Sequence, residues 1–189
     1  MKDLKTFIDP RFKTLGERTV NRAKEILSKL NIPFWLSNGS LLGCIREGNL
    51  IPHDEDIDIG VWDACCLEHE VIKRSFLENG FRLCSELGRP GNAHEYSFIT
   101  PEGVRLDIFF YIQEADHCWM GLWTSAEKPM RMVFPSIPSF IMKKFAGGIF
   151  PVPSNYEDML YANYGDWQVP DKTGTGLALQ RIYFPKSLG

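Results

Sequence analysis

The chain has 189 residues, of which 44% are hydrophobic and 13% aromatic, so it can bury a core and is not a disordered chain. Its formal net charge of −3 gives no overall basic surface, and we expect no nucleic-acid partner. No stretch is apolar enough to span a bilayer, and the charged N-terminal segment has no signal-peptide core. The five cysteines show no CxxC spacing, which is typical of reduced thiols. We therefore expect one cytoplasmic domain over residues 1–189, with no membrane span.

The first third of the chain predicts a helix, a strand and a second helix. Apolar residues recur at near-helical spacing across 14–31, which indicates a helix with one face on the core. The sequence FWLS at 34–37 is typical of a short buried strand. The following NGSLLGCIREG predicts a short helix, with Asn38 or Ser40 as its N-cap and Gly48 at its end.

The remaining chain predicts mainly strands, with two further helices. Residues 113–150 give only short strands and loops rich in aromatic side chains. A final helix is expected over 154–165, with Ser154 as N-cap and Gly165 as its stop, followed by an irregular tail. Between these regions we expect an acidic strand at 51–61, a helix at 64–79, a strand at 81–87 and a hairpin of 94–100 with 104–112. The whole predicts an α/β domain of the α+β kind, with a small mixed or mostly antiparallel sheet flanked by helices.

The acidic strand, IPHDEDIDIGV, alternates carboxylates with apolar side chains. Alternate residues of a strand face the same side, so Ile57, Ile59 and Val61 would face the core, with Asp56 and Asp58 on the opposite side. The Cα atoms of these two aspartates would lie about 7 Å apart, and their oxygens could converge on one cation. Without a cation, their repulsion in a partly buried site costs several kcal/mol. A hard divalent ion relieves it, and oxygen ligands favour Mg²⁺ or Mn²⁺.

The same alternation recurs in VRLDIFFYI, where a single carboxylate interrupts an apolar strand. Leu106, Ile108 and Phe110 would share one face, with Asp107 and Arg105 on the other. A lone acid in such a strand is best explained as a third ligand from a neighbouring strand. Three carboxylates on two strands can hold two metal ions about 3.5–4 Å apart, an arrangement suited to phosphoryl transfer.

The segment SNGSLLG has the composition of an anion site at a helix start. Backbone N–H groups there bind anions, and Gly39 would allow close approach of a phosphate. Arg46, one or two turns further on, could donate to the same phosphate. Each feature alone is weak, but the order of Gly-Ser helix, DxD strand and single-Asp strand is much more specific.

The acidic residues at 54–58 allow three other interpretations. An EF-hand needs Gly after the third acid and Glu six residues later, but Ile59 and Cys65 occupy those positions. A solvated acidic loop explains Asp54 and Glu55 but not the alternation that follows. A sugar-nucleotide glycosyltransferase also uses a DxD motif with a metal, and this alternative stays open. It leaves the Gly-Ser helix and Asp107 without a role.

The motifs together resemble the LicD/fukutin family, within the nucleotidyltransferase-fold superfamily. The resemblance rests on FWLSNGSLLGCIREGNLIPHDEDIDIGV, on VRLDIFFY and on FPVPSNYEDMLYANYGDW, in the expected order across residues 34–170. It implies a nucleotidyltransferase-like fold and an enzyme that takes a CDP-activated alcohol, such as CDP-choline or CDP-ribitol. Such an enzyme transfers the phospho-alcohol to a hydroxyl of a saccharide or glycoconjugate.

The resemblance also implies roles for individual residues. It assigns the metal to three carboxylates: Asp56, Asp58 and Asp107. It assigns contacts on the substrate side to four residues of the first motif: Gly39, Ser40, Arg46 and Asp54. We expect Asp107 to accept the proton of the attacking hydroxyl. True nucleotidyl transfer with release of pyrophosphate, and a non-catalytic nucleotide- or sugar-binding module, are the alternative functions.

Overall fold

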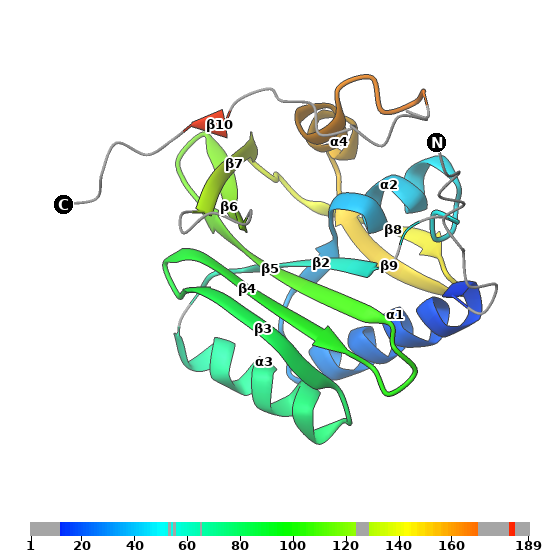
Figure 1. The fold of residues 1–189 in the computed structure, drawn as a ribbon. Coiled ribbons are helices and arrows are strands. Elements are labelled where there is room, and N and C mark those ends of the chain that lie inside the picture. Colours follow the sequence, from blue (N-terminus) through cyan, green and yellow to red (C-terminus); the bar gives the residue numbers. More distant parts are fainter. Residues whose placement is uncertain are drawn as a thin grey trace, which may run out of the picture.

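The computed structural model describes residues 12–52, 54, 56–64, 66–123, 129–169 and 182–183 (Figure 1). They form four helices: α1 (Phe12–Lys29), α2 (Asn38–Arg46), α3 (Cys66–Glu78) and α4 (Tyr156–Tyr164). Their strands are β1 (Phe34–Leu36), β2 (Asp56–Trp62), β3 (Arg82–Arg89), β4 (Asn92–Ile99), β5 (Arg105–Gln113), β6 (His117–Trp123), β7 (Pro129–Pro135), β8 (Phe140–Phe145), β9 (Gly148–Pro153) and β10 (Ile182–Tyr183).

Strand β5 is the centre of the main sheet. It pairs parallel with β2 on one side and antiparallel with β4 on the other, and its last residues pair with β6. The sheet continues from β2 to β1, from β4 to β3, and from β6 through β7 to β10. Strands β8 and β9 form a separate two-stranded sheet. The sheet is therefore mixed and mostly antiparallel, as the sequence predicted.

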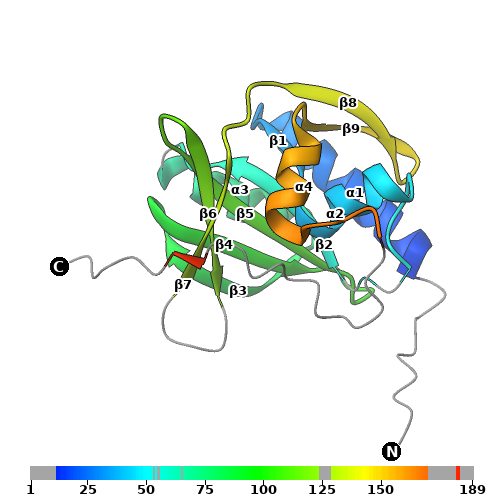
Figure 2. The ribbon, with the colours of Figure 1, turned by 90° about the horizontal axis from the view of Figure 1, so that it is seen from above.

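Helices cover both faces of this sheet (Figures 1 and 2). Helices α1 and α3 contact each other on one face, whereas α2 and α4 contact each other on the opposite face. The predicted alternation in the acidic strand is confirmed, because Ile57, Ile59 and Val61 are fully buried in the hydrophobic core. Their register partners in β5 are Leu106, Ile108 and Phe110, which are equally buried. This apolar face fixes the direction in which the opposite, polar face points.

The predicted N-caps of two helices are wrong by one or more residues. Helix α2 begins after Ser37, which has extended backbone angles, and not after Asn38 or Ser40. The Ser37 hydroxyl forms no cap bond and instead lies 2.6 Å from the Tyr111 hydroxyl. Helix α4 has Asn155, not Ser154, at its N-cap, whereas Gly165 ends that helix as predicted. The Ser37 and Ser154 hydroxyls instead contact Tyr111 and Ser139, which are tertiary partners that local pattern does not encode.

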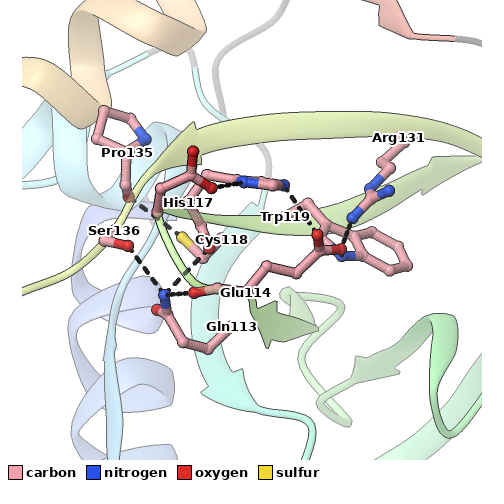
Figure 3. A network of polar contacts seen from close by, with 9 residues as sticks. Gln113, Glu114, His117, Cys118, Trp119, Arg131, Pro135 and Ser136 are labelled. Atoms are coloured by element: carbon pink, nitrogen blue, oxygen red, sulfur yellow. Dashed lines mark hydrogen bonds and ion pairs between the residues drawn. The ribbon is translucent and has the colours of Figure 1, made fainter.

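The region after residue 113 forms strands, and polar side chains hold them together (Figure 3). The Gln113 amide nitrogen contacts the His117 carbonyl at 3.0 Å and Ser136 Oγ at 2.9 Å. Glu114 accepts a 2.8 Å hydrogen bond from Trp119 and pairs with Arg131, whose guanidinium lies over the Trp119 ring. These bonds connect β5, β6 and β7. Because polar contacts leave no strong apolar periodicity in the sequence, the boundaries of these strands could not be predicted sharply.

Several expectations lie partly or wholly outside the described residues. The predicted irregular tail falls largely on residues 170–181, and Glu55 and Cys65 are also not described. Within the described part of the chain, every helix is too short or too polar to cross a membrane. The single-domain and cytoplasmic assignments stay predictions.

A close approach between β1 and β2 gives a test of the fold. Trp35 is the register partner of Gly60, and a Cβ atom at Gly60 would lie 2.4 Å from the Trp35 ring. We expect Gly60→Ala to lower the free energy of unfolding by about 1–3 kcal/mol, because the added methyl group would overlap the buried Trp35 ring. Denaturant unfolding of the purified protein measures this loss.

A double-mutant cycle with Trp35→Phe checks the cause. The smaller ring leaves room for the added methyl group, so the double variant should lose less stability than the sum of the two single variants. Strict additivity would contradict a steric origin.

Candidate metal centre

Three carboxylates converge on the polar face of the sheet. Because β2 and β5 run parallel in register, Asp58 lies directly beside Asp107, and Asp56 precedes Asp58 by two residues on the same face. Each residue offers an oxygen atom, and these oxygens lie within 4.8 Å of one another. Asp58 and Asp107 are buried, with exposed fractions of 7% and 3%. The structure thus brings the three predicted ligands together at one point.

The electrostatics of this cluster favour a cation. Burial raises the pKa of Asp58 far above its usual value, and the neighbouring Asp56, Asp54 and Asp107 raise it further. Burial also raises the pKa of Asp107. Hard divalent cations prefer ligands that are all oxygen atoms, and such a cation would also relieve the repulsion between the acids. The residues present therefore fit a Mg²⁺ or Mn²⁺ ion.

The start of α2 positions Asp58. The Gly39 N–H donates to Asp58 Oδ2 at 2.8 Å, and the Asp58 N–H donates to Ser40 Oγ at 2.9 Å. A Cβ atom on Gly39 would lie 2.6 Å from Asp54 Oδ2 and 3.0 Å from Asp58 Oδ2. Only glycine leaves room for both carboxylates. The structure therefore places Gly39, Ser40 and Asp54 at the cluster, while their contacts with a phosphate stay predictions.

Arg46 is not brought to the cluster. It lies in the last turn of α2, about two turns or roughly 10 Å of helix from Gly39. Its guanidinium donates to Glu47 Oε1 at 2.8 Å and to the Trp167 carbonyl at 3.5 Å. These contacts tie the end of α2 to the segment after α4. The predicted contact between Arg46 and the phosphate has no geometric support from this arrangement.

Arg105 is the cationic side chain that the structure places beside Asp107. Its Nε donates to Asp107 Oδ1 at 2.9 Å, and its Nη2 donates to Ser97 Oγ at 3.2 Å. In register, Arg105 lies opposite Asp56. The signal was present in the sequence, because Arg105 precedes Asp107 by two residues and shares its face of the strand.

Glu95 is a further buried acid that sequence reasoning missed. It lies on β4, where its neighbour Ser97 is the register partner of Asp107, so Glu95 and Ser97 face the metal centre. Glu95 is 5% exposed and accepts a 3.4 Å hydrogen bond from Ser97. Burial, and then the charge of Asp107, raise the pKa of Glu95 to about 7. Its position depends on the register of β4, which sequence alone does not give.

Helix α4 closes one side of the site. Asn163 donates to Asn38 at the start of α2, over 3.1 Å. The next residue, Tyr164, has a raised pKa because it is buried and because Asp58 and Asp54 are close to it. Helix α4 therefore lies beside the site, through Asn163, which contacts α2, and Tyr164, which is close to the acids.

Comparisons with known proteins agree on one family. A family model described as "LicD/FKTN/FKRP, nucleotidyltransferase domain" matches residues 31–155. The ribitol-5-phosphate transferase FKTN of Homo sapiens is 32% identical over 165 residues, which cover 86% of this chain and 35% of the relative. The ribitol 5-phosphate transferase FKRP of Homo sapiens is 27% identical, over 74% of this chain and 29% of the relative. The chain thus spans about a third of the length of these two relatives.

Solved structures show the same fold at low sequence identity. The lincosamide antibiotic adenylyltransferase LnuA, solved with lincomycin bound, aligns with a TM-score of 0.53 and 15% identity over 77% of this chain and 84% of that one. The enzyme ANT(2″)-Ia, in complex with adenylyl-2″-tobramycin, gives the same TM-score and identity over 78% of this chain and 73% of that one. The fold of this chain is therefore nucleotidyltransferase-like.

The raised pKa of Glu95 predicts a stability effect that depends on pH. The pKa of Glu95 rises from its ordinary value of 4.5 in the unfolded chain to about 7 in the folded protein. Between these values the folded state holds more protons, so wild-type stability falls as the pH rises through this window. Without divalent cations, Glu95→Gln should therefore be more stable than wild type above pH 7, by at most about 3 kcal/mol.

Urea unfolding at pH 5 and pH 8 measures this difference, with Glu102→Gln as the control. Glu102 is exposed in the turn between β4 and β5, so its substitution should change stability little at either pH. A gain from Glu95→Gln of equal size at both pH values would show that burial of the charge is not its cause.

Proposed function

This chain belongs to the LicD/FKTN/FKRP nucleotidyltransferase-domain family, and on that premise we propose that it transfers a phospho-alcohol from a CDP-linked donor to a saccharide hydroxyl. The observation that carries this proposal is the convergence of Asp56, Asp58 and Asp107 at the start of α2. The names of the FKTN and FKRP relatives support ribitol phosphate as one transferred group, and phosphocholine is a second candidate.

We propose that Asp56, Asp58 and Asp107 hold Mg²⁺ or Mn²⁺. Their oxygens are close enough to share one ion, and their mutual repulsion is the energy that the ion relieves. When bound, such an ion supplies positive charge that neutralises the donor's diphosphate and stabilises CMP as it leaves.

The protein's own groups would bind the donor and accept one proton. The Gly39 N–H at the start of α2 already donates to Asp58, and we propose that the donor phosphates bind beside this helix start. The acceptor oxygen attacks the phosphorus that carries the alcohol, and the bond from that phosphorus to CMP breaks. The hydroxyl proton passes to a carboxylate, for which we propose Asp107. Glu95, on the same face with a pKa of about 7, is the alternative acceptor.

True nucleotidyl transfer is the second candidate function, because the two solved neighbours are adenylyltransferases or carry an adenylylated product. A non-catalytic binding module is less consistent with the site, since three repelling acids are costly to keep without a cation. Product analysis separates the enzymatic alternatives. CMP released from CDP-ribitol or CDP-choline, with a metal present, supports the proposal, whereas pyrophosphate released from CTP supports nucleotidyl transfer.

The metal assignment predicts a specific loss of binding. Asp56→Asn and Asp58→Asn each remove one charged ligand, so either change should weaken Mn²⁺ binding by at least tenfold in calorimetry. Asp116→Asn removes an exposed carboxylate on the loop between β5 and β6 and serves as the control. Unchanged Mn²⁺ affinity in both site variants would refute the assignment.

A residue that is both metal ligand and base should differ in its kinetics from a residue that is only a metal ligand. If Asp107 is both ligand and base, Asp107→Asn should lower turnover by about 10²–10⁴-fold while donor binding survives in part, because asparagine still offers an oxygen. Asp56→Asn should weaken donor binding and turnover together. Rates of CMP release, combined with donor affinities, measure both effects.

Glu95→Gln decides between the two acids. If turnover falls by the same factor in this variant while metal and donor affinities stay at wild-type values, Glu95 is the base and Asp107 is only a ligand. Wild-type turnover in Glu95→Gln would leave Asp107 as the base.

A further inference from the structure

The triad has one cationic neighbour among the ion pairs of the described residues. Arg105 Nε lies 2.9 Å from Asp107 Oδ1, and Arg105 is also the register partner of Asp56. One guanidinium cannot balance three carboxylates, but it lowers their repulsion. Arg105 therefore acts as a partial counter-ion of the cluster.

The two partners of this ion pair differ in their freedom to move. The Asp107 side chain is 4% exposed, whereas the Arg105 side chain is 50% exposed. Asp107 is held within a strand that pairs on both sides, while Arg105 is the first residue of that strand. A long arginine stem can move its charged head without disturbing the backbone. The carboxylate is fixed and the guanidinium is the part that can leave.

We propose that Arg105 neutralises the triad in the absence of metal and, once Asp107 serves as a metal ligand, turns outward to bind the diphosphate of the donor. This inference rests on the proposed function. A carboxylate oxygen shared with a divalent cation is a weaker acceptor for a guanidinium, and the two cations repel each other. The planar guanidinium fork matches phosphate oxygens and stays charged at any working pH.

A purely structural role for Arg105 gives the opposite expectation. If Arg105 only orients Asp107, its removal should weaken metal binding, and any effect on the donor should follow from that loss. If Arg105 competes with the metal and then binds the donor, its removal should strengthen one interaction and weaken the other. The signs of the two changes distinguish these roles.

The test compares Arg105→Met with wild type by calorimetry, first with Mn²⁺ alone and then with CDP at saturating Mn²⁺. Methionine keeps the apolar stem and removes the charge. We expect Mn²⁺ to bind about two- to fivefold more tightly, as suits the loss of a half-exposed ion pair. We expect CDP to bind about 10- to 100-fold more weakly, as suits the loss of a charge-assisted phosphate contact.

Two further variants control the experiment. Arg105→Lys keeps the charge without the fork and should lie between wild type and Arg105→Met in both measurements. Arg74→Met removes an exposed arginine from α3, which covers the opposite face of the sheet, and should change neither affinity.

The outcomes separate this inference from the proposed function. Weaker Mn²⁺ binding in Arg105→Met, unchanged CDP affinity in that variant, or no CDP binding by the wild type would each overturn the role of Arg105. If the affinities change as expected but no CDP-alcohol is turned over, the inference holds and the proposed transferase activity fails instead.

Discussion

The parallel register of β2 and β5 places Asp58 and Asp107 side by side in the interior. The contacts around them hold the two carboxylates in place despite their repulsion. The chain fixes one carboxylate from the backbone, through the N–H of Gly39, and the other from a side chain, through Arg105. Neither contact cancels the charge of the cluster. What is left is an excess of negative charge, which favours the binding of a cation.

Another carboxylate with a buried side chain, Asp63, shows how partners from the protein can compensate for burial. Asp63 follows β2 closely, and burial alone would raise its pKa. The contact with His69 Nε2, at 3.0 Å, and the hydrogen bond from the Gly91 N–H, at 2.7 Å, instead lower that pKa. The pKa of Asp58, only a few residues earlier, is shifted in the opposite direction. The difference lies in the partners: Asp63 is satisfied by the protein, whereas Asp58 is surrounded by other acids.

The local sequence pattern correctly predicted those features that depend only on neighbouring residues. The alternation through Ile57 and Ile59 identified both faces of β2, and the Pro-Glu-Gly turn identified the hairpin of β4 and β5, because side-chain direction in a strand follows position alone. Glu95 was missed since its orientation toward the site depends on a pairing register. Arg46 was favoured for its nearness in sequence to Gly39, yet helix geometry carries it away, while β5 brings Arg105 to the acids. The three matching motifs gave the family, and the register of the sheet supplied the rest of the site.

The parallel pairing of β2 with β5 also bears on how the chain folds. Strands β3, β4 and β5 are joined by short turns and can pair early, whereas β2 must close a long loop that contains α3 before it can dock. The cluster of acids is thus completed by a pairing between strands that α3 and the β3–β4 hairpin separate in the chain. A divalent cation meets its full set of ligands only after that contact has formed, so it should retard unfolding far more than it speeds folding. In this protein the ion would bind only after the sheet has formed in spite of the repulsion between its acids, and it would then stabilise the folded state.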